Sequence, residues 1–258
     1  MGIVDGKTAL IFGVANDHSI AWGITRALYD NGATIALSYG ADPLERRVRP
    51  LAGQVGASFI EKCDVSDDAQ IERLFAAARE RLGRIDILVH AIGFAPREEM
   101  RGAFSDTSRD GFRTTMDISA YSLVALTRAA LPLMSDGGSV ITLTYYGGEK
   151  VAAGYQVMGV AKAALESSAR YLAAELGPRG VRVNAISAGP VRTLAAAGVP
   201  GFKEAYARVA ETAPMRRPID IDDVGNAALW LASDMSRNVT GQTIFVDAGH
   251  SILAPGAV

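Results

Sequence analysis

The chain has 258 residues and an almost balanced charge, with 26 Lys and Arg against 28 Asp and Glu and a net charge of −2. That balance excludes binding to DNA or RNA mainly through bulk positive charge, so we expect no nucleic-acid partner. Hydrophobic residues at 49% and charged residues at 21% are typical of a globular protein rather than a disordered one.

The single cysteine, Cys63, excludes an intrachain disulfide and favours a reducing compartment. The first residues carry Asp5 and a short apolar run that ends at Asn16, without the basic leader and small-residue cleavage site of a signal peptide. No apolar stretch approaches the ~20 residues that a membrane span needs. We therefore expect a cytoplasmic protein without a membrane anchor.

Seven short, mostly apolar runs predict β-strands that are covered on both faces. They are residues 8–14, 34–39, 58–65, 85–92, 139–145, 181–187 and 243–246. Helical patterns lie between them, such as residues 67–82, where apolar side chains share one face, Asp67 and Asp68 begin the helix and Gly83 ends it.

Alternating strands and helices predict one α/β domain over residues 1–258, because no repeat or linker divides the chain. We expect a Rossmann-like, doubly wound parallel sheet of about seven strands with helices on both faces. Its ligand site should lie beyond the carboxyl ends of the strands.

The turn after the first strand lacks the dinucleotide fingerprint Gly-x-Gly-x-x-Gly, because Ala15 replaces the second glycine. Gly13 and the small residues after it still let backbone N–H groups approach a pyrophosphate, and Ser19 offers a hydroxyl where the next helix begins. An ordinary strand-to-helix loop is the alternative.

The second strand ends at Gly40, where an acidic side chain would bind the adenosine ribose of NAD. Asp42 lies two residues later, and Arg46 and Arg47 follow in the next helix. The residues themselves therefore leave the choice between NADH and NADPH open. His90, at the end of the fourth predicted strand, is interpreted as a core histidine rather than a catalyst.

Tyr155 and Lys162 are the strongest candidates for chemistry. On a helix, seven positions turn through roughly 700°, so the two residues would share one face about 10 Å apart at the backbone. Lys162 is the only charged residue between Lys150 and Glu166, and a cation in an apolar segment needs a partner or a ligand. A snorkelling lysine beside a core tyrosine is the alternative.

Several motifs occur together in the chain: Gly13-Val14-Ala15 with Ser19-Ile20-Ala21, Cys63-Asp64-Val65, Ile92-Gly93-Phe94-Ala95-Pro96, Asp117-Ile118-Ser119, Tyr145 with Tyr155 and Lys162, and residues 184–195. In these motifs the chain resembles, from Gly6 to about Ile252, the bacterial enoyl-acyl-carrier-protein reductases of the short-chain dehydrogenase/reductase superfamily. Most of the superfamily has Tyr-x-x-x-Lys, which would put a lysine at position 159, where this chain has glycine. In the superfamily, that displacement separates enoyl reduction from carbonyl reduction.

The resemblance implies roles for individual residues. Tyr155 and Lys162 would be catalytic, Tyr145 would be a second active-site tyrosine, and Ala95 would contact the substrate. The residues implied to bind NADH, with NADPH as the alternative, are Gly13, Ser19, Ile20, Gly40, Asp64, Val65, Ile92, Lys162, Val191, Arg192, Thr193, Leu194 and Ala195. No metal is implied. Two departures from the family are Gly40, which lacks a side chain for the ribose, and Ala248, where a second glycine is usual.

The implied reaction is hydride transfer from NADH to the β-carbon of a trans-2-enoyl thioester on acyl carrier protein, the reductive step of fatty acid elongation. Residues 191–212 are expected to form a substrate-binding lid, with Lys203 and Arg208 as candidate contacts for an acidic carrier protein. The resemblance also suggests a homotetramer. The alternatives are a carbonyl reductase, such as one acting on 3-ketoacyl thioesters, and a nucleotide-binding scaffold without chemistry.

Overall fold

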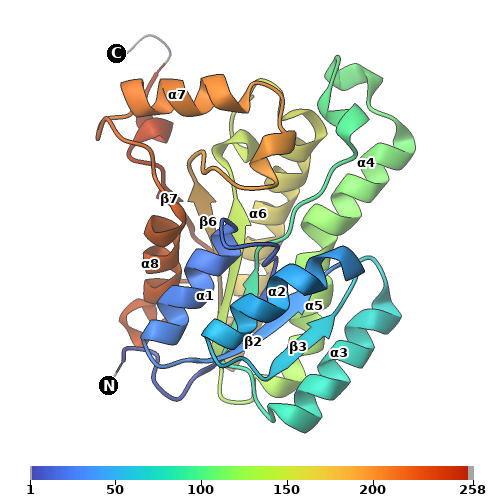
Figure 1. Ribbon diagram of the computed structural model, residues 1–258, viewed down its shortest axis with the longest axis vertical. Helices are drawn as coiled ribbons and strands as arrows, with labels where there is room; N and C mark the ends of the chain where they lie inside the picture. Colours follow the sequence, from blue (N-terminus) through green and yellow to red (C-terminus); the bar gives the residue numbers. More distant parts are fainter. Residues whose placement is uncertain (1, 255–258) are drawn as a thin grey trace.

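The computed structural model describes residues 2–254 and contains one sheet of seven parallel strands in the order β3-β2-β1-β4-β5-β6-β7 (Figure 1). The strands are β1 (Thr8–Phe12), β2 (Thr34–Tyr39), β3 (Phe59–Lys62), β4 (Ile87–His90), β5 (Gly138–Thr144), β6 (Val181–Ala188) and β7 (Thr243–Val246). The strand order reverses between β1 and β4, which is the topological switch point of a doubly wound sheet. The predicted fold is confirmed.

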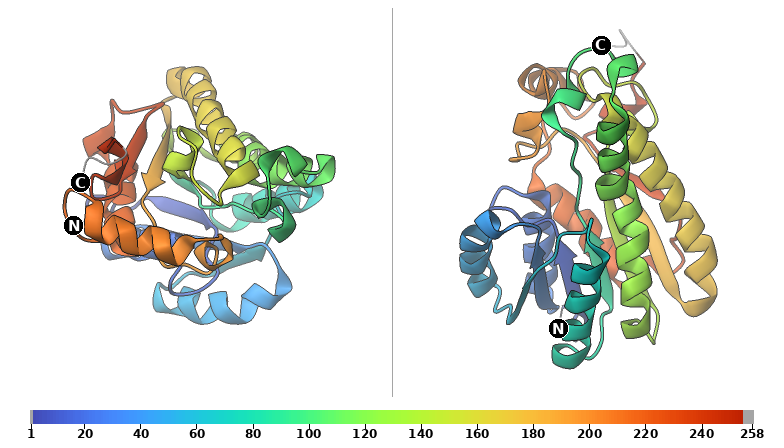
Figure 2. Two further views of the ribbon diagram at one scale, coloured as in Figure 1. Left: turned by 90° about the horizontal axis from the view of Figure 1, so that it is seen from above. Right: turned by 90° about the vertical axis from the view of Figure 1, so that its right-hand side faces the viewer.

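Helices cover both faces of the sheet (Figures 1 and 2). One face carries α1 (Ile20–Asp30), α2 (Asp42–Gln54) and α8 (Ile221–Ala232), and the other carries α3 (Asp68–Arg81), α5 (Ser122–Ala130) and α6 (Gln156–Leu176). Helix α4 (Arg109–Met116) precedes α5, and α7 (Phe202–Thr212) lies beyond the carboxyl ends of the strands. No helix within residues 2–254 combines the length and the apolar composition needed to cross a membrane.

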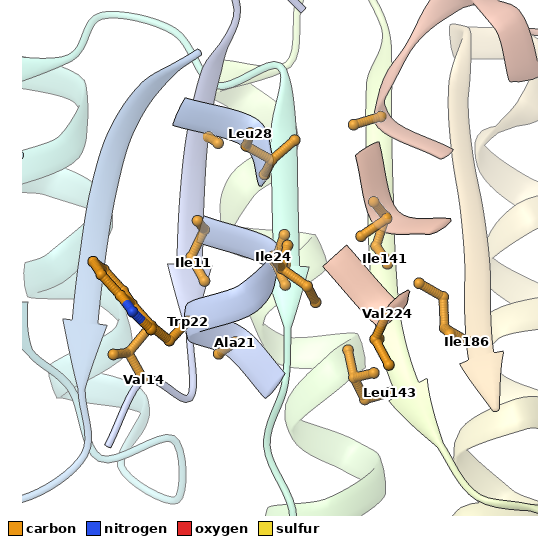
Figure 3. Close-up of a cluster of buried hydrophobic side chains, with 14 of the residues drawn as sticks. Ile11, Val14, Ala21, Trp22, Ile24, Leu28, Ile141, Leu143, Ile186 and Val224 are labelled. Carbon is orange, nitrogen blue, oxygen red and sulfur yellow. The ribbon is translucent and has the colours of Figure 1, made fainter. Parts of the chain in front are cut away.

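Strands β1 to β6 contribute side chains to two apolar cores, one on each face of the sheet. On β1, Ile11 packs toward α1 and α8, whereas Leu10 packs toward α3 and α5. Figure 3 shows the first core, where Ile24 and Leu28 of α1 meet the sheet. Glycines bring α1 and α8 close together, since a Cβ on Gly23 would lie 2.2 Å from the Ile221 carbonyl oxygen.

Several element boundaries differ from the sequence prediction. β1 ends at Phe12 rather than at residue 14, because Gly13 takes a left-handed φ of +106°. The predicted helix 67–82 is confirmed as α3, with the Asp67 carboxylate accepting hydrogen bonds from the backbone of Ala69 and Gln70. The apolar segment that follows α4 is not one regular helix, since Asp117–Tyr121 forms a π-helical turn before α5.

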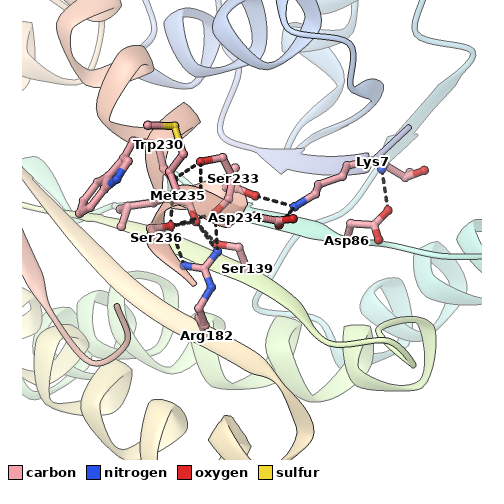
Figure 4. Close-up of polar contacts among 12 residues, drawn as sticks. Lys7, Asp86, Ser139, Arg182, Trp230, Ser233, Asp234, Met235 and Ser236 are labelled. Carbon is pink, nitrogen blue, oxygen red and sulfur yellow. Dashed lines mark hydrogen bonds and ion pairs between the residues drawn. The ribbon is translucent and has the colours of Figure 1, made fainter. Parts of the chain in front are cut away.

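The amino-terminal edge of the sheet carries a dense polar network (Figure 4). The Arg182 guanidinium donates hydrogen bonds to the Leu231 carbonyl at 2.7 Å and to Ser236 Oγ at 3.0 Å. Lys7 Nζ lies 2.7 Å from Asp234 Oδ1, and Asp86 accepts the backbone N–H of Thr8. These contacts tie α8 and the loop after it to the strands.

Candidate active site

The predicted site residues come together at the carboxyl edge of the sheet. Gly13, Gly40 and Ile92 follow β1, β2 and β4, and Tyr145 and Val191 follow β5 and β6. Because all seven strands run parallel, their carboxyl ends share one edge. The implied cofactor and catalytic positions therefore lie along one edge of the sheet, on both sides of the switch point between β1 and β4.

The loop into α1 is shaped by Ser19. Its Oγ accepts hydrogen bonds from the backbone of Ala15 at 3.0 Å and Asn16 at 3.1 Å, and the hydroxyl donates to Asn16 Oδ1 at 3.1 Å. The side chain therefore builds the loop, and no side chain caps the first turn of α1. The Trp22 and Gly23 amides donate to the Ser19 carbonyl, so the amides of Ile20 and Ala21 are the ones left for an anion, which fits a pyrophosphate.

The ends of β2 and β3, where the sequence predicts the adenosine of the cofactor, carry the next group of predicted residues. Gly40 is exposed, and Asp42 pairs with Lys62 at 2.8 Å instead of standing free for a ribose. The Asp64 carboxylate accepts hydrogen bonds from the backbone and hydroxyl of Ser66, while Val65 is buried in the core. A hollow of about 330 Å³ lies beside this end, lined by Asn16, Asp17, Arg47 and Leu51.

Lys162 points into the sheet. The residue is 6% exposed, and its Nζ donates to the Leu143 carbonyl at 2.7 Å and to the Ile92 carbonyl at 3.4 Å. Burial lowers the pKa of its ammonium to about 8. The buried head excludes a snorkelling lysine. An ammonium has three protons, so one N–H remains for a ligand.

Tyr155 is not part of the helix that carries Lys162, which corrects the predicted helical spacing. It precedes α6 as the N-cap residue, and Gln156 has a left-handed φ of +40°, so ideal helix geometry does not extend to position 155. The tyrosine nevertheless reaches the same strand end, because its ring centroid lies 4.9 Å from that of Tyr145 at an interplanar angle of 71°.

Apolar residues surround Tyr155 on its other side. Met158 and Ala161 of α6 form a small buried cluster against which Tyr155, Ala95 and Val199 pack. The predicted substrate residue Ala95 and a segment of the predicted lid therefore share a cluster with the predicted catalytic tyrosine. Burial, and the negative charge of Glu166, raise the pKa of Tyr155, so its phenol stays protonated at neutral pH.

Glycines let the loop after β5 approach α6. A Cβ on Gly147 would lie 2.7 Å from Tyr155 Cδ1, and one on Gly159 would lie 2.8 Å from the Gly147 carbonyl oxygen. A side chain at position 159 would therefore require this loop to move. The structure favours glycine where carbonyl reductases of the superfamily have lysine.

One feature of the site was missed by sequence reasoning, and one expectation was met. Ser119, in the π-helical turn, accepts the backbone N–H of Phe94 and donates to the Phe94 carbonyl, both at 2.9 Å, and so fixes the strand that leads to Ala95. His90 is fully buried between Thr142 and Ser122, each hydroxyl 2.8 Å from a ring nitrogen. Burial lowers its pKa to about 3, as fits the expected core histidine.

The segment after β6 begins buried and then becomes exposed. Val191 packs in the core, and the Arg192 guanidinium lies 4.4 Å from the ring centroid of Tyr206 on α7. Thr193 Oγ1 accepts the backbone N–H of Ala196, while Leu194 and Ala195 are exposed. Gly154 has a φ of +75°, and a Cβ there would lie 2.5 Å from the Pro200 carbonyl oxygen, so this segment contacts the loop that carries Tyr155.

Comparison with known proteins points to one family. The model of the family "Enoyl-(Acyl carrier protein) reductase" matches residues 13–251. An NADH-dependent enoyl-[acyl-carrier-protein] reductase of Rhizobium meliloti is 52% identical over 257 residues, which cover 100% of this chain and 94% of that protein. Another, from Aquifex aeolicus, is 50% identical, with 98% and 94% covered.

Solved structures agree. The crystal structure of the Aquifex aeolicus enoyl reductase superposes with a TM-score of 0.96 at 49% identity, over 98% of this chain and 99% of that one. The Bacillus cereus enoyl reductase, determined with NADP⁺ and an indole naphthyridinone, gives 0.97 at 47% identity, over 98% and 100%.

Proposed function

Because the chain belongs to the family of enoyl-[acyl-carrier-protein] reductases, we propose that the carboxyl edge of its sheet reduces trans-2-enoyl thioesters as follows. The predicted activity, an NADH-dependent oxidoreductase of fatty acid synthesis, is confirmed by the relatives. One observation carries the residue assignment. The ring of Tyr155 packs against Tyr145, and Lys162 donates to the Leu143 carbonyl, so both side chains reach the carboxyl end of β5.

Tyr155 acts on the substrate carbonyl. Reduction at the β-carbon places negative charge on the thioester oxygen, which becomes an enolate. The protonated phenol donates a hydrogen bond to that oxygen, and a donor aimed at developing charge is often the largest catalytic contribution. Tyr145, packed edge-on against Tyr155, holds the ring in place.

The residues at the strand ends fit the dinucleotide. The uncapped amides of α1 bind the pyrophosphate, and the remaining N–H of Lys162 binds the nicotinamide ribose. Bound NADH supplies the hydride. Residues 191–195 follow β6 at the same edge of the sheet, and Asp64 and Val65 follow β3 on the side proposed for the adenosine. Gly40 offers no side chain to the ribose, and Asp42 is paired with Lys62.

Residues 191–212 form the substrate lid in this proposal. Val199 packs in the cluster beside Tyr155, and the Arg192 contact with Tyr206 links the start of the segment to α7. Closing this segment would exclude water from the enolate. Lys203 and Arg208 are exposed on α7, where they face solvent as a carrier-protein contact requires.

Self-association is part of the proposal. The helices that precede and follow β5 expose apolar side chains, including Tyr121, Val160 and Tyr171, which is 78% exposed. Such surfaces fit subunit contacts of a homotetramer. We place the enzyme in the cytoplasm, where the lone buried Cys63 stays reduced.

The experiment that tests the reaction follows NADH oxidation with a crotonyl thioester and, separately, an acetoacetyl thioester, and repeats both with NADPH. We expect turnover of the crotonyl thioester with NADH. Turnover of the keto substrate alone would establish the carbonyl reductase instead, and cofactor binding without turnover of either would establish the scaffold.

A further inference from the structure

Two buried polar side chains, one helical turn apart, connect α6 to the end of β5. Lys162 donates to the Leu143 carbonyl at 2.7 Å, and the next residue of the strand, Thr144, donates from its hydroxyl to Glu166 Oε1 at 2.6 Å. Thr144 and Glu166 are each 5% exposed. A carboxyl group this deeply buried is rare unless it has a partner or a role.

The surroundings of Glu166 are built around it. A Cβ on Gly148 would lie 2.8 Å from Glu166 Oε1, so the loop after β5 leaves room for the carboxylate only because residue 148 has no side chain. The i, i+4 spacing on α6 puts Glu166 on the same helix face as Lys162. One face of the helix therefore presents a cation and an anion to consecutive residues of the strand that leads to Tyr145.

From this juxtaposition we propose that Glu166, oriented by Thr144, is a positioning residue that keeps Lys162 protonated for the nicotinamide ribose. The inference rests on the proposed role of Lys162 and adds to it a countercharge. Desolvation lowers the pKa of the ammonium, and a nearby carboxylate raises it again. Without the carboxylate, the amine would lose its proton at lower pH and one ribose contact would weaken.

Several other titratable groups act on the pair, among them Tyr155, whose pKa is raised by burial and by the charge of Glu166. Arg170, on the same helix, and Glu149, from the loop after β5, act on Glu166, and both are exposed. His90 on β4 faces Lys162 and is held neutral by burial. Desolvation raises the pKa of Glu166, while the Thr144 hydrogen bond lowers it, so the hydroxyl favours the ionised carboxylate.

The test measures NADH affinity by fluorescence between pH 6.5 and 9.5 for the wild-type protein and Glu166→Gln. Glutamine keeps an oxygen for Thr144 and removes only the charge. In the wild type, the dissociation constant should rise as pH passes about 8, where Lys162 deprotonates. In Glu166→Gln, the same rise should begin about one pH unit lower, the size of a typical shift from one nearby charge.

Two matched controls accompany it. Glu175→Gln makes the same change at an exposed position of α6, and Thr144→Ser keeps the hydroxyl donor; both should follow the wild-type curve. If Glu166→Gln does not fold, Thr144→Val replaces it, and the rise in dissociation constant should move in the same direction by a smaller amount.

An unchanged curve for Glu166→Gln, an equal shift for Glu175→Gln, or a wild-type affinity that is constant across the range would each overturn the proposal. The readout is cofactor binding, so it stays separate from the reaction itself. A wild-type protein that fails to reduce the crotonyl thioester would contradict the proposed function while leaving the pH curve readable.

Discussion

The two edges of the sheet differ in how their charged side chains are partnered. At the amino-terminal edge, the Arg182 guanidinium donates to the Leu231 carbonyl and to Ser236, and Lys7 pairs with Asp234 (Figure 4). At the carboxyl edge, two carbonyls accept from Lys162, and the first turn of α1 has no side-chain cap. The first edge satisfies its charged groups within the protein, whereas the second keeps donors for a ligand.

This difference separates stability from function. Donors whose partners all lie within the chain hold elements together, so removing them should lower the free energy of unfolding. Donors held in place but left with a free proton serve a ligand, so removing them should lower activity and leave the fold intact. The predictions below test that separation.

The largest effect is expected at the carboxyl edge, for Tyr155→Phe. Loss of the phenol donor should lower kcat about 100- to 1000-fold, as removal of one oxyanion donor typically does. The melting temperature and the NADH dissociation constant should change little, because the ring stays in contact with Tyr145. Steady-state kinetics measure kcat, NADH fluorescence measures the dissociation constant, and thermal denaturation measures the melting temperature.

Tyr171→Phe is the matched control, since Tyr171 lies on α6 and is 78% exposed. Its kcat should equal that of the wild type. A kcat for Tyr155→Phe within tenfold of the wild type would show that the phenol is not the main donor.

The opposite result is expected at the amino-terminal edge, for Arg182→Met. The substitution removes hydrogen bonds from a charged donor to the Leu231 carbonyl and Ser236, and should cost about 2–3 kcal/mol of unfolding free energy. Well below the melting temperature, kcat/KM should be unchanged. Urea denaturation and kinetics check this, with the exposed Arg237→Met as control. A loss of activity in the folded variant would contradict the separation of stability from function.

The fold was predictable because its signals are local. Seven apolar runs alternate with amphipathic helices, and parallel strands buried on both faces leave few other arrangements. The sequence prediction was wrong at the ends of strands and helices and where a helix is interrupted. Nothing in residues 117–121 signals a π turn, whose extra residue is set by packing and by the Ser119 contact with Phe94.

For the site, the sequence predicted only those residues that belong to recognisable motifs. Tyr155 and Lys162 were predicted from a helical spacing and from the family resemblance; the left-handed Gln156 breaks the spacing, and their roles stay a prediction. The roles of Thr144 and Glu166 depend on a contact across 22 positions of sequence, which no spacing rule gives. Ala248 was noticed only as a departure from glycine, whereas the structure shows a left-handed φ of +57° there.

The third prediction concerns His90, which lies at the carboxyl edge and yet has both ring nitrogens engaged by Ser122 and Thr142. Its folded pKa of about 3 is far below the unfolded value of about 6.5. Between these values the unfolded chain binds a proton that the folded chain does not, so stability should fall as pH falls below 6.5, by up to about 1.4 kcal/mol per pH unit.

The contribution of His90 is isolated by comparing variants, because carboxylates also titrate in this range. His90→Gln keeps a donor and an acceptor for the two hydroxyls and cannot be protonated, so its unfolding free energy should fall less steeply than that of the wild type between pH 6.5 and 4.5. His18→Gln removes an exposed histidine and should keep the wild-type slope. Equal slopes for all three proteins would mean that His90 takes up a proton in the fold. His90 would then accept a proton although both of its ring nitrogens are engaged by hydroxyls. In that case a position at the carboxyl edge, rather than a free donor, would distinguish the groups that serve the ligand.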